Sequence, residues 1–135
     1  MSDWNRQVIE EFRANGGRVG GPFEGRPLLL LHHTGARTGT RRVTPLMHQE
    51  VGDGWAIFAS KGGADTNPAW YHNLLAHPET EIEIGDRTVA VTARVLAGAE
   101  YEAVWSRQKD DDPFFAEYEE ATARDHIPVL VLEPR

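Results

Sequence analysis

The segment with the clearest chemical potential is a basic turn at residues 34–42, which reads Thr-Gly-Ala-Arg-Thr-Gly-Thr-Arg-Arg and follows the apolar residues 28–31. Gly35 and Gly39 allow backbone conformations that other residues resist, and they can bring amide N–H groups close to a ligand. Threonine hydroxyls and arginine guanidinium groups add donors that suit phosphate or carboxylate. The turn therefore predicts a site for an anionic group. A second donor-rich loop follows at residues 60–68, Ser-Lys-Gly-Gly-Ala-Asp-Thr-Asn-Pro.

The spacing of the glycines argues against two common nucleotide-binding motifs. A phosphate-binding NTPase needs a glycine, four residues and then Gly-Lys-Ser/Thr, whereas Gly35 and Gly39 are separated by three residues and no lysine follows. A dinucleotide fold opens a helix after its glycines, but here a strand is expected. From the residues alone, the alternative to an anion site is an ordinary glycine turn with solvated arginines.

The charge distribution favours a small anionic ligand over a nucleic acid. The chain has 14 Lys plus Arg against 21 Asp plus Glu, a net charge of −7, which disfavours a large polyphosphate partner. The segment from residue 100 onward is rich in acid. Two acids and five bases lie between residues 26 and 61, and the bases are Arg26, Arg37, Arg41, Arg42 and Lys61.

Other residue types limit the chemistry and the location of the protein. The chain has no cysteine, so disulfides, thiolate metal ligands and a cysteine nucleophile are excluded, and a reducing cytoplasm is compatible. No secretory signal or membrane-spanning run is recognisable, so we expect a cytoplasmic protein.

No metal site is expected. Adjacent His32 and His33 should point to opposite faces of a strand, and His72 and His77 lack the helical spacing that places two ligands on one side. The acidic residues 110–112 lack the ligand spacing of a calcium loop and should form a solvated loop.

The elements that position these residues are mostly strands. We expect strands at 28–32, 42–50, 55–60, 81–84, 88–96 and 127–132, with Asp53-Gly54 and Gly85-Asp86 as hairpin turns. Helices are expected at 69–76, with Asn67 as cap and Pro68 in the first turn, and at 99–107 and 114–124. Six strands linked mainly by hairpins predict an antiparallel barrel with covering helices, in a single domain over residues 1–135.

An amphipathic helix is expected within residues 1–17. Its apolar face carries Trp4, Val8, Ile9 and Phe12, with a cap at Ser2 or Asp3 and a stop at residues 15–17. This face either packs on the core or forms a lid over a lipophilic substrate. A third alternative is a foot on a membrane surface, for which the helix has few basic residues.

Several motifs together resemble one known family. They are Thr34-Gly35 with Arg37-Thr38-Gly39, Arg42, Pro45, Ala59-Ser60-Lys61-Gly62-Gly63, Asn67-Pro68 with Trp70-Tyr71, and Ile127-Pro128. The pattern is similar to the deazaflavin-dependent nitroreductases of actinobacteria, also described as reduced coenzyme F-420-dependent quinone reductases. The resemblance implies a split β-barrel, like that of flavin reductases, with the cofactor in a groove on the barrel wall.

The resemblance also implies which residues bind the cofactor. Arg37 and Arg42, with the amides of Thr38 and Gly39, would hold the phosphodiester and oligoglutamate tail, and Lys61 would reach the same region. Three charge-assisted hydrogen bonds contribute roughly 5 to 9 kcal/mol, whereas association costs about 4 to 15 kcal/mol. Burial of a flat ring must therefore contribute as well. The candidate ring walls are Pro45, Met47, Phe58, Ala59 and Trp70, with a place in the core as the alternative for Trp70 and its neighbour Tyr71.

The same resemblance implies residues near the reaction itself. Ser60 matches the serine beside the deazaflavin ring or the acceptor, with an ordinary strand-end serine as the alternative. Tyr118 matches a tyrosine that contacts the acceptor or supplies a proton. Phe115 stands where the family often has a further tyrosine, which should weaken recognition of polar nitroaromatic acceptors more than that of quinones with apolar tails.

The sequence thus predicts an oxidoreductase that passes a hydride from the reduced deazaflavin to a quinone-like or other conjugated acceptor, with promiscuous nitroreduction as an extension. One alternative is an FMN-dependent reductase with the same barrel. Another is a non-catalytic carrier of lipophilic ligands. The partners left open are a membrane surface contacted by the first helix and a second copy of the chain.

Overall fold

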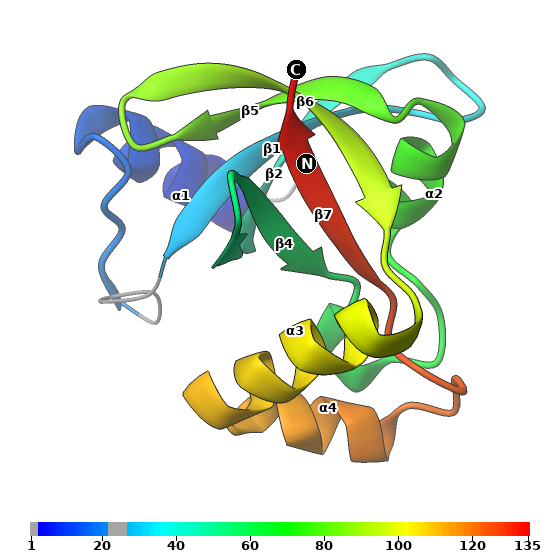
Figure 1. Cartoon of the computed structure of the whole chain (residues 1–135). Helices are drawn as coiled ribbons and strands as arrows, with labels where there is room; N and C mark the ends of the chain where they lie inside the picture. Colours follow the sequence, from blue (N-terminus) through cyan, green and yellow to red (C-terminus); the bar gives the residue numbers. More distant parts are fainter. Residues whose placement is uncertain (1–2, 22–26) are drawn as a thin grey trace.

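The molecule is built on one antiparallel sheet. The computed structural model describes residues 3–21 and 27–135, and its sheet is curled into a half-barrel with the strand order β2-β1-β5-β6-β7-β4-β3 (Figure 1). The strands are β1 (Leu28–Thr34), β2 (Arg41–Met47), β3 (Gln49–Val51), β4 (Gly54–Phe58), β5 (Glu79–Ile84), β6 (Arg87–Val95) and β7 (Val129–Pro134). The prediction of an antiparallel barrel with covering helices is confirmed.

The two edges of the sheet are joined through His48. The sequence predicted one strand at residues 42–50, but the structure divides it into β2, which pairs with β1, and β3, which pairs with β4. The backbone N–H of His48 donates to the Pro27 carbonyl at 3.2 Å, which continues the β1–β2 register by one residue, and β3 begins at the next residue. A single stretch of chain therefore contributes to both ends of the sheet and curls it.

Helices cover both faces of the sheet. They are α1 (Asp3–Ala14), α2 (Ala69–Ala76), α3 (Gly98–Asp111) and α4 (Phe114–Ala121), and a short 3-10 turn, η2, spans Lys61–Gly63. In Figure 1, α1 lies against one end of the half-barrel, α2 against the opposite side, and α3 and α4 below β4 and β7. Among the described residues, none of these helices has the length and apolar character that crossing a bilayer requires.

The alternation of side chains along β4 divides the core. Trp55, Ile57 and Ala59 pack in one cluster with Trp70 and other residues on the α2 side. Ala56 and Phe58 point the other way, into a cluster covered by α3 and α4. This is the period-two pattern of a strand buried on both faces.

The amphipathic face of α1 belongs to the core. Val8, Ile9 and Phe12 are buried and pack against Leu28 and Leu30 of β1. Trp4 is half exposed, so the predicted stripe is buried over only part of its length. The predicted cap at Ser2 or Asp3 lies outside the described residues and side chains.

The start of α2 differs from the prediction that Asn67 caps the helix. The residue before the helix is Pro68, in an extended conformation and with no side-chain cap. The Oδ1 atom of Asn67 instead accepts a hydrogen bond from Arg124 at 2.6 Å. The prediction of the cap is wrong because a distant guanidinium uses the same oxygen.

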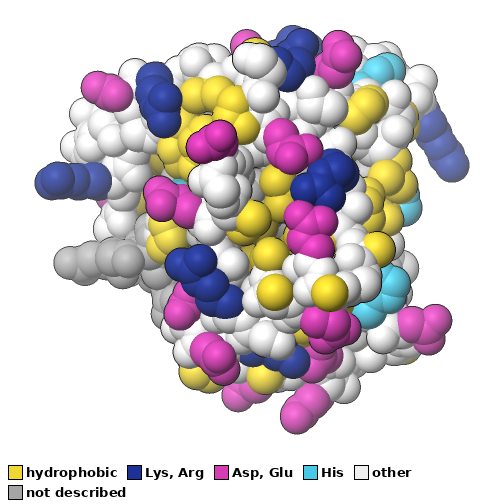
Figure 2. Space-filling view, viewed as in Figure 1, with side chains coloured by type: hydrophobic (Ala, Val, Ile, Leu, Met, Phe, Trp, Pro, Cys, Tyr) yellow, Lys and Arg dark blue, Asp and Glu magenta, His cyan; other side chains and the backbone are white. Residues whose placement is uncertain are grey.

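Two predicted helix ends also move. Helix α3 continues to Asp111 rather than ending at residue 107, so the prediction of a loop at residues 110–112 is wrong for Asp110 and Asp111. Asp111 lies 3.6 Å from the Nε atom of Arg107, a pair of helical spacing that supports the added turn. Helix α4 ends at Ala121, before the predicted residue 124. Figure 2 shows acidic side chains gathered over the lower part of the visible face, where α3 and α4 lie.

Candidate active site

An open cleft lies along the start of edge strand β2, between α1 and α2. Its volume is about 380 Å³. Asn5 of α1 and Ala69 and Trp70 of α2 line two sides. The remaining wall comes from β1 and β2, and its residues are His33, Thr40, Arg41, Arg42, Val43 and Thr44. The cleft thus combines an indole ring with cationic and hydroxyl groups.

Arg42 is a cation of this cleft without an acidic partner. It is exposed, and among the described residues no carboxylate lies within ion-pair distance of Arg42 or of the nearby exposed Arg37. Several other guanidinium groups among the described residues are ion-paired; Arg94, for example, contacts both Glu100 and Glu133. Unpaired cations at the mouth of a cleft are suited to bind phosphate or carboxylate.

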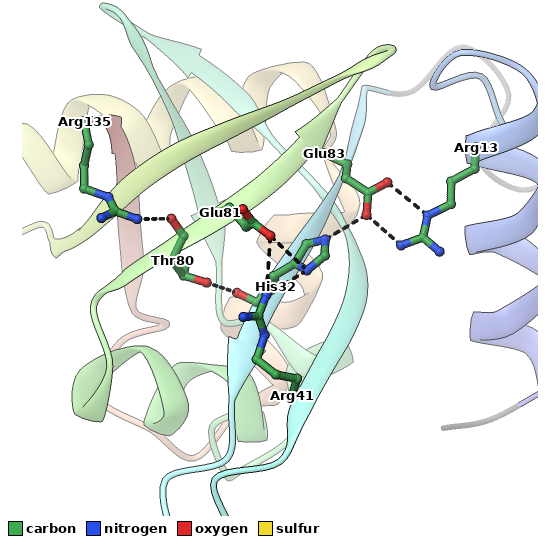
Figure 3. Close-up of polar contacts among 7 residues, drawn as sticks. All are labelled: Arg13, His32, Arg41, Thr80, Glu81, Glu83 and Arg135. Carbon is green, nitrogen blue, oxygen red and sulfur yellow. Dashed lines mark hydrogen bonds and ion pairs between the residues drawn. The ribbon is translucent and has the colours of Figure 1, made fainter.

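Arg41, the neighbouring residue, points to the opposite side of β2 and is held there. Figure 3 shows its guanidinium beside His32 and Glu81, at 3.2 Å from His32 Nδ1 and 3.5 Å from Glu81 Oε1. His32 Nε2 contacts Glu83 Oε2 at 2.7 Å, and Arg13 of α1 donates to the same carboxylate. The cluster ties α1 to the sheet and partly neutralises Arg41.

His33 faces the cleft side of the sheet, as the opposite-face prediction for His32 and His33 requires. Its Nε2 lies 2.8 Å from Thr44 Oγ1, and its Nδ1 lies 2.9 Å from Asn73 Nδ2. Burial lowers the pKa of His33 to about 4, and the charges of Arg42 and His32 act in the same direction. His33 is therefore a neutral hydrogen-bonding residue at physiological pH.

The predicted anion turn lies at residues 35–40, next to α2. The turn is closed by its own backbone, because Gly39 N–H donates to the Gly35 carbonyl at 2.9 Å. A Cβ atom on Gly35 would lie 2.5 Å from Thr38 Oγ1, which explains the need for glycine. Arg37, Thr38 and Gly39 are exposed on this turn, immediately before the cleft residue Thr40. With the Gly39 amide already bonded, the side chains of Arg37 and Thr38 are the better placed donors.

The second predicted loop, residues 60–68, is held by the segment after α4. Arg124 donates to the carbonyl oxygens of Ala59 and Ser60 at 2.8 and 2.9 Å, and also to Asn67. Thr122 Oγ1 donates to the Ala64 carbonyl at 2.7 Å. The loop leads directly into Ala69 and Trp70, so these contacts set the position of one cleft wall.

The polar residues of this loop are near α2 but not in the described lining of the cleft. Ser60 is half-buried, and its carbonyl serves Arg124. Lys61 is exposed, has a positive φ of 47°, and donates to Thr66 Oγ1 at 3.2 Å. Ala59 is fully buried in the same cluster as Trp70. The structure thus places Arg42 and Trp70 in the cleft and these residues beside it.

Tyr118 lies on α4, against the glycine turn that follows Ser60. A Cβ on Gly63 would lie 3.1 Å from Tyr118 Cα, so the loop and α4 are in close contact. The rings of Phe115 and Tyr118 lie 5.5 Å apart, and Phe115 is buried against Phe58. A tyrosine hydroxyl at position 115 would therefore enter the core. Phe58 packs in this cluster, on the face of the sheet opposite to Trp70.

The last two predicted ring walls follow Arg42 along β2. Pro45 pairs with Leu30 of β1, and a proline is tolerated here because β2 is an edge strand. Met47 is half-buried and packs between the α1 cluster and the α3–α4 cluster. Neither residue is in the described lining of the cleft.

Several residues of this region were not predicted as site residues, among them the cleft residues His33 and Thr44 and the supporting residues Asn73 and Arg124. Asn73 Oδ1 accepts the Ala36 N–H at 2.9 Å, which fixes the turn on α2. Asn73 lies on a helix and Arg124 follows the last helix. Their partners are far away in the sequence, so no local residue spacing identifies them.

Comparisons with known proteins agree with the curled antiparallel sheet and identify the family. Residues 4–134 match the family described as F420H(2)-dependent quinone reductase. The chain belongs to this family. Coenzyme F-420, a deazaflavin, is accordingly its cofactor, and the protein is an oxidoreductase.

Individual relatives cover nearly the whole chain. The F420H(2)-dependent quinone reductase Rv1261c of Mycobacterium tuberculosis is 39% identical over 128 residues, which are 92% of this chain and 85% of that protein. A solved F420-H2 dependent reductase, FDR-A, is 40% identical with a TM-score of 0.72, covering 80% of this chain and 95% of its own. A structure described as a domain-swapped dimer is 38% identical with a TM-score of 0.74, covering 97% and 98%.

The cleft residues fit such a cofactor. Trp70 is mostly buried in the core, 5% exposed, and only the edge of its residue surface borders the cleft, so it offers a limited apolar contact. Arg42 in the lining and Arg37 on the adjacent turn provide positive charge for an anionic tail. The volume lies at the lower end of the range for ligand pockets, so the cleft suits part of a long cofactor and the exposed turn is available to the rest.

Proposed function

We propose that the protein uses reduced coenzyme F-420, bound along β2, to reduce a quinone-like acceptor. The observation that carries the proposal is the shared cleft: Arg42 and Trp70 line one cavity next to the turn that presents Arg37. The cofactor supplies the hydride, so the protein needs no nucleophile of its own. The chain must bind, orient and shield the reacting groups.

Each proposed binding residue has a definite task. Arg42, Arg37 and Lys61 attract the anionic tail, and Thr38 adds a hydroxyl at the exposed turn. Trp70 supports the ring, and Asn5 of α1 borders the opposite side of the cleft, so α1 is proposed as a wall or lid of the site. Ala59, Pro45, Met47 and Phe58 shape the surrounding barrel rather than line the described cleft.

Ser60 and Tyr118 are proposed to serve the acceptor side. They belong to two segments in contact, since Gly63 packs against the backbone of Tyr118. Among the described residues no group bonds the Tyr118 hydroxyl, so it is available to donate a hydrogen bond or a proton to a carbonyl oxygen of the acceptor. Phe115 contributes packing alone, which favours quinones over nitroaromatic acceptors.

Two measurements test the proposal. Titration of the deazaflavin with the purified protein, followed by fluorescence polarisation, should give saturable binding. Mixing the protein with reduced coenzyme F-420 and menadione should restore the absorbance of the oxidised deazaflavin. Saturable binding without turnover would refute the acceptor, whereas no binding would refute the cofactor site.

We also propose that the protein forms a homodimer. The support is the relative described as a domain-swapped dimer, which aligns with 97% of this chain. Sedimentation equilibrium over a range of protein concentrations tests the proposal, and a constant monomer mass would refute it.

A further inference from the structure

A continuous chain of hydrogen bonds connects the anion turn with the cleft wall. It begins at the Ala36 N–H, which donates to Asn73 Oδ1 at 2.9 Å. Asn73 Nδ2 lies 2.9 Å from His33 Nδ1, and His33 Nε2 lies 2.8 Å from Thr44 Oγ1. Asn73 and His33 are buried, and His33 and Thr44 line the cleft.

The direction of each bond follows from the first one. A backbone N–H can only donate, so the Asn73 atom that it meets is the carbonyl oxygen and the other atom is the amide NH₂. This NH₂ donates to His33 Nδ1, which must therefore carry a lone pair. In a neutral imidazole the proton is then on Nε2, and it is donated to Thr44 Oγ1.

The consequence appears at Thr44. Its oxygen accepts from His33, so its own hydroxyl hydrogen remains available. Within the part of the chain that the structure describes, no protein group accepts this hydrogen. Thr44 belongs to the same strand and the same cleft as Arg42.

We infer that His33 is a positioning residue whose Nε2–H makes Thr44 a hydrogen-bond donor to an acceptor oxygen of the ligand in the Arg42 cleft. Because His33 already donates to one lone pair of Thr44 Oγ1, a ligand N–H or O–H cannot donate to that same lone pair. The oxygen is a carbonyl of the ring or an oxygen of the anionic tail. The inference rests on the proposed function, because that function supplies the ligand.

The chain also couples the two parts of the site. Asn73 holds the turn through Ala36 and fixes the tautomer of His33 with the same amide group, so displacement of the turn would remove the bond that orients this amide. Burial keeps the imidazole neutral, as the lowered pKa of His33 indicates. The position of the turn therefore favours the tautomer that makes Thr44 a donor.

The tautomer can be measured without any cofactor. Long-range ¹H–¹⁵N correlation spectra of the labelled protein near pH 7 should show His33 as the neutral Nε2–H form. Observation of the Nδ1–H form would overturn the inference. This result does not depend on binding, so it separates the inference from the proposed function.

The donor at Thr44 is tested by binding of the deazaflavin cofactor. Thr44→Val keeps the shape and removes the hydroxyl, and should weaken binding roughly fivefold to tenfold. Thr44→Ser should restore affinity to within about twofold, since the hydroxyl returns. Thr92→Val, on β6 and also half-buried, is the matched control and should bind like the wild type.

The outcomes distinguish the possible failures. Unchanged affinity in Thr44→Val, with normal binding by the wild type, would overturn the inference and leave the proposed function intact. No binding by the wild type would refute the proposed function, and with it the ligand of this inference. Repeating the titration with the deazaflavin riboside, which lacks the phosphate tail, assigns the oxygen: a matching loss indicates the ring, and a loss confined to the full cofactor indicates the tail.

Discussion

The guanidinium of Arg124 donates to the carbonyl oxygen of Ser60 at 2.9 Å, and so a residue near the end of the chain holds the loop beside the candidate active site. The same side chain reaches Ala59 and Asn67. A half-buried backbone carbonyl that loses its hydrogen-bond donor destabilises the folded protein, because the oxygen is left without a partner. Arg124 is therefore expected to stabilise both the fold and the cleft wall at Trp70.

Replacement of Arg124 by alanine should lower the free energy of unfolding by roughly 2 to 4 kcal/mol, because several hydrogen bonds to a charged donor are lost. Urea unfolding followed by tryptophan fluorescence measures this change. Arg87→Ala is the matched control, since Arg87 is exposed on the β5–β6 turn and has no ion pair within the described residues. Equal stability of the two variants would contradict the role of Arg124.

Replacement of Arg42 by alanine should weaken binding of coenzyme F-420 by about 10-fold to 100-fold, the effect of losing one charge-assisted contact. Arg37→Ala should show a smaller loss, because Arg37 lies on the turn outside the described lining. Fluorescence polarisation at two salt concentrations measures both effects. If Arg42→Ala binds as tightly as Arg87→Ala, the anionic tail does not lie in this cleft.

The glycine at position 63 should be required for the contact between its loop and α4. Gly63→Ala places a Cβ 3.1 Å from Tyr118 Cα at a φ of 84°, so we expect a loss of stability of about 1 to 3 kcal/mol. Gly62→Ala is the control, because Gly62 has a φ of 64° but open space around it. The additional loss of unfolding free energy in Gly63→Ala relative to Gly62→Ala, measured by urea unfolding, gives the cost of the close contact between residue 63 and Tyr118. Equal losses would show that the strained backbone alone matters.

The buried His33 should make the protein less stable in acid. Its pKa is lowered to about 4 from 6.5, first by burial and then by Arg42 of β2 and the neighbouring His32. Between these values the unfolded chain binds a proton that the native protein does not, so stability rises with pH over this window and is complete above pH 6.5. The lowered pKa of His33 changes the free energy of unfolding by about 3 kcal/mol between the acid end and the neutral end of this window.

The variant that isolates this contribution is His33→Gln, which retains a polar side chain without a titrating ring. The difference in unfolding free energy between the wild type and this variant should decline as the pH falls from about 6.5 to 4, in a series of urea titrations. A difference that stays constant over this range would mean that His33 titrates alike in the folded and unfolded protein.

The helix α1 should behave as part of the core. Phe12 is 1% exposed, so Phe12→Ala should lower the free energy of unfolding by about 3 to 5 kcal/mol. Glu10→Ala, at an exposed position of the same helix, should change it by less than about 0.5 kcal/mol. Thermal unfolding of both variants provides the measurement. Similar stabilities would show that α1 is a detachable lid.

The local patterns of the sequence account for much of the fold. Alternating side chains in residues 81–84 and 88–96 gave the β5–β6 hairpin, and the spacing of Val8, Ile9 and Phe12 identified the buried face of α1. Such patterns are reliable because a strand or helix shows its neighbours the same face at a fixed period. They do not reveal where a long strand changes partners, as β2 and β3 do at His48.

By itself the sequence determined the barrel class and the family through its turn and loop motifs, since these depend on residue types at short spacing. Only the tertiary structure decided that Arg41 is ion-paired whereas Arg42 has no carboxylate partner among the described residues. It also decided that Asn67 accepts from Arg124 and that Phe58 and Trp70 lie on opposite faces of the sheet. The contact between Arg124 and Ala59 joins residues 65 positions apart. Such contacts depend on how the whole sheet curls, because curvature brings distant segments together and no local pattern encodes it.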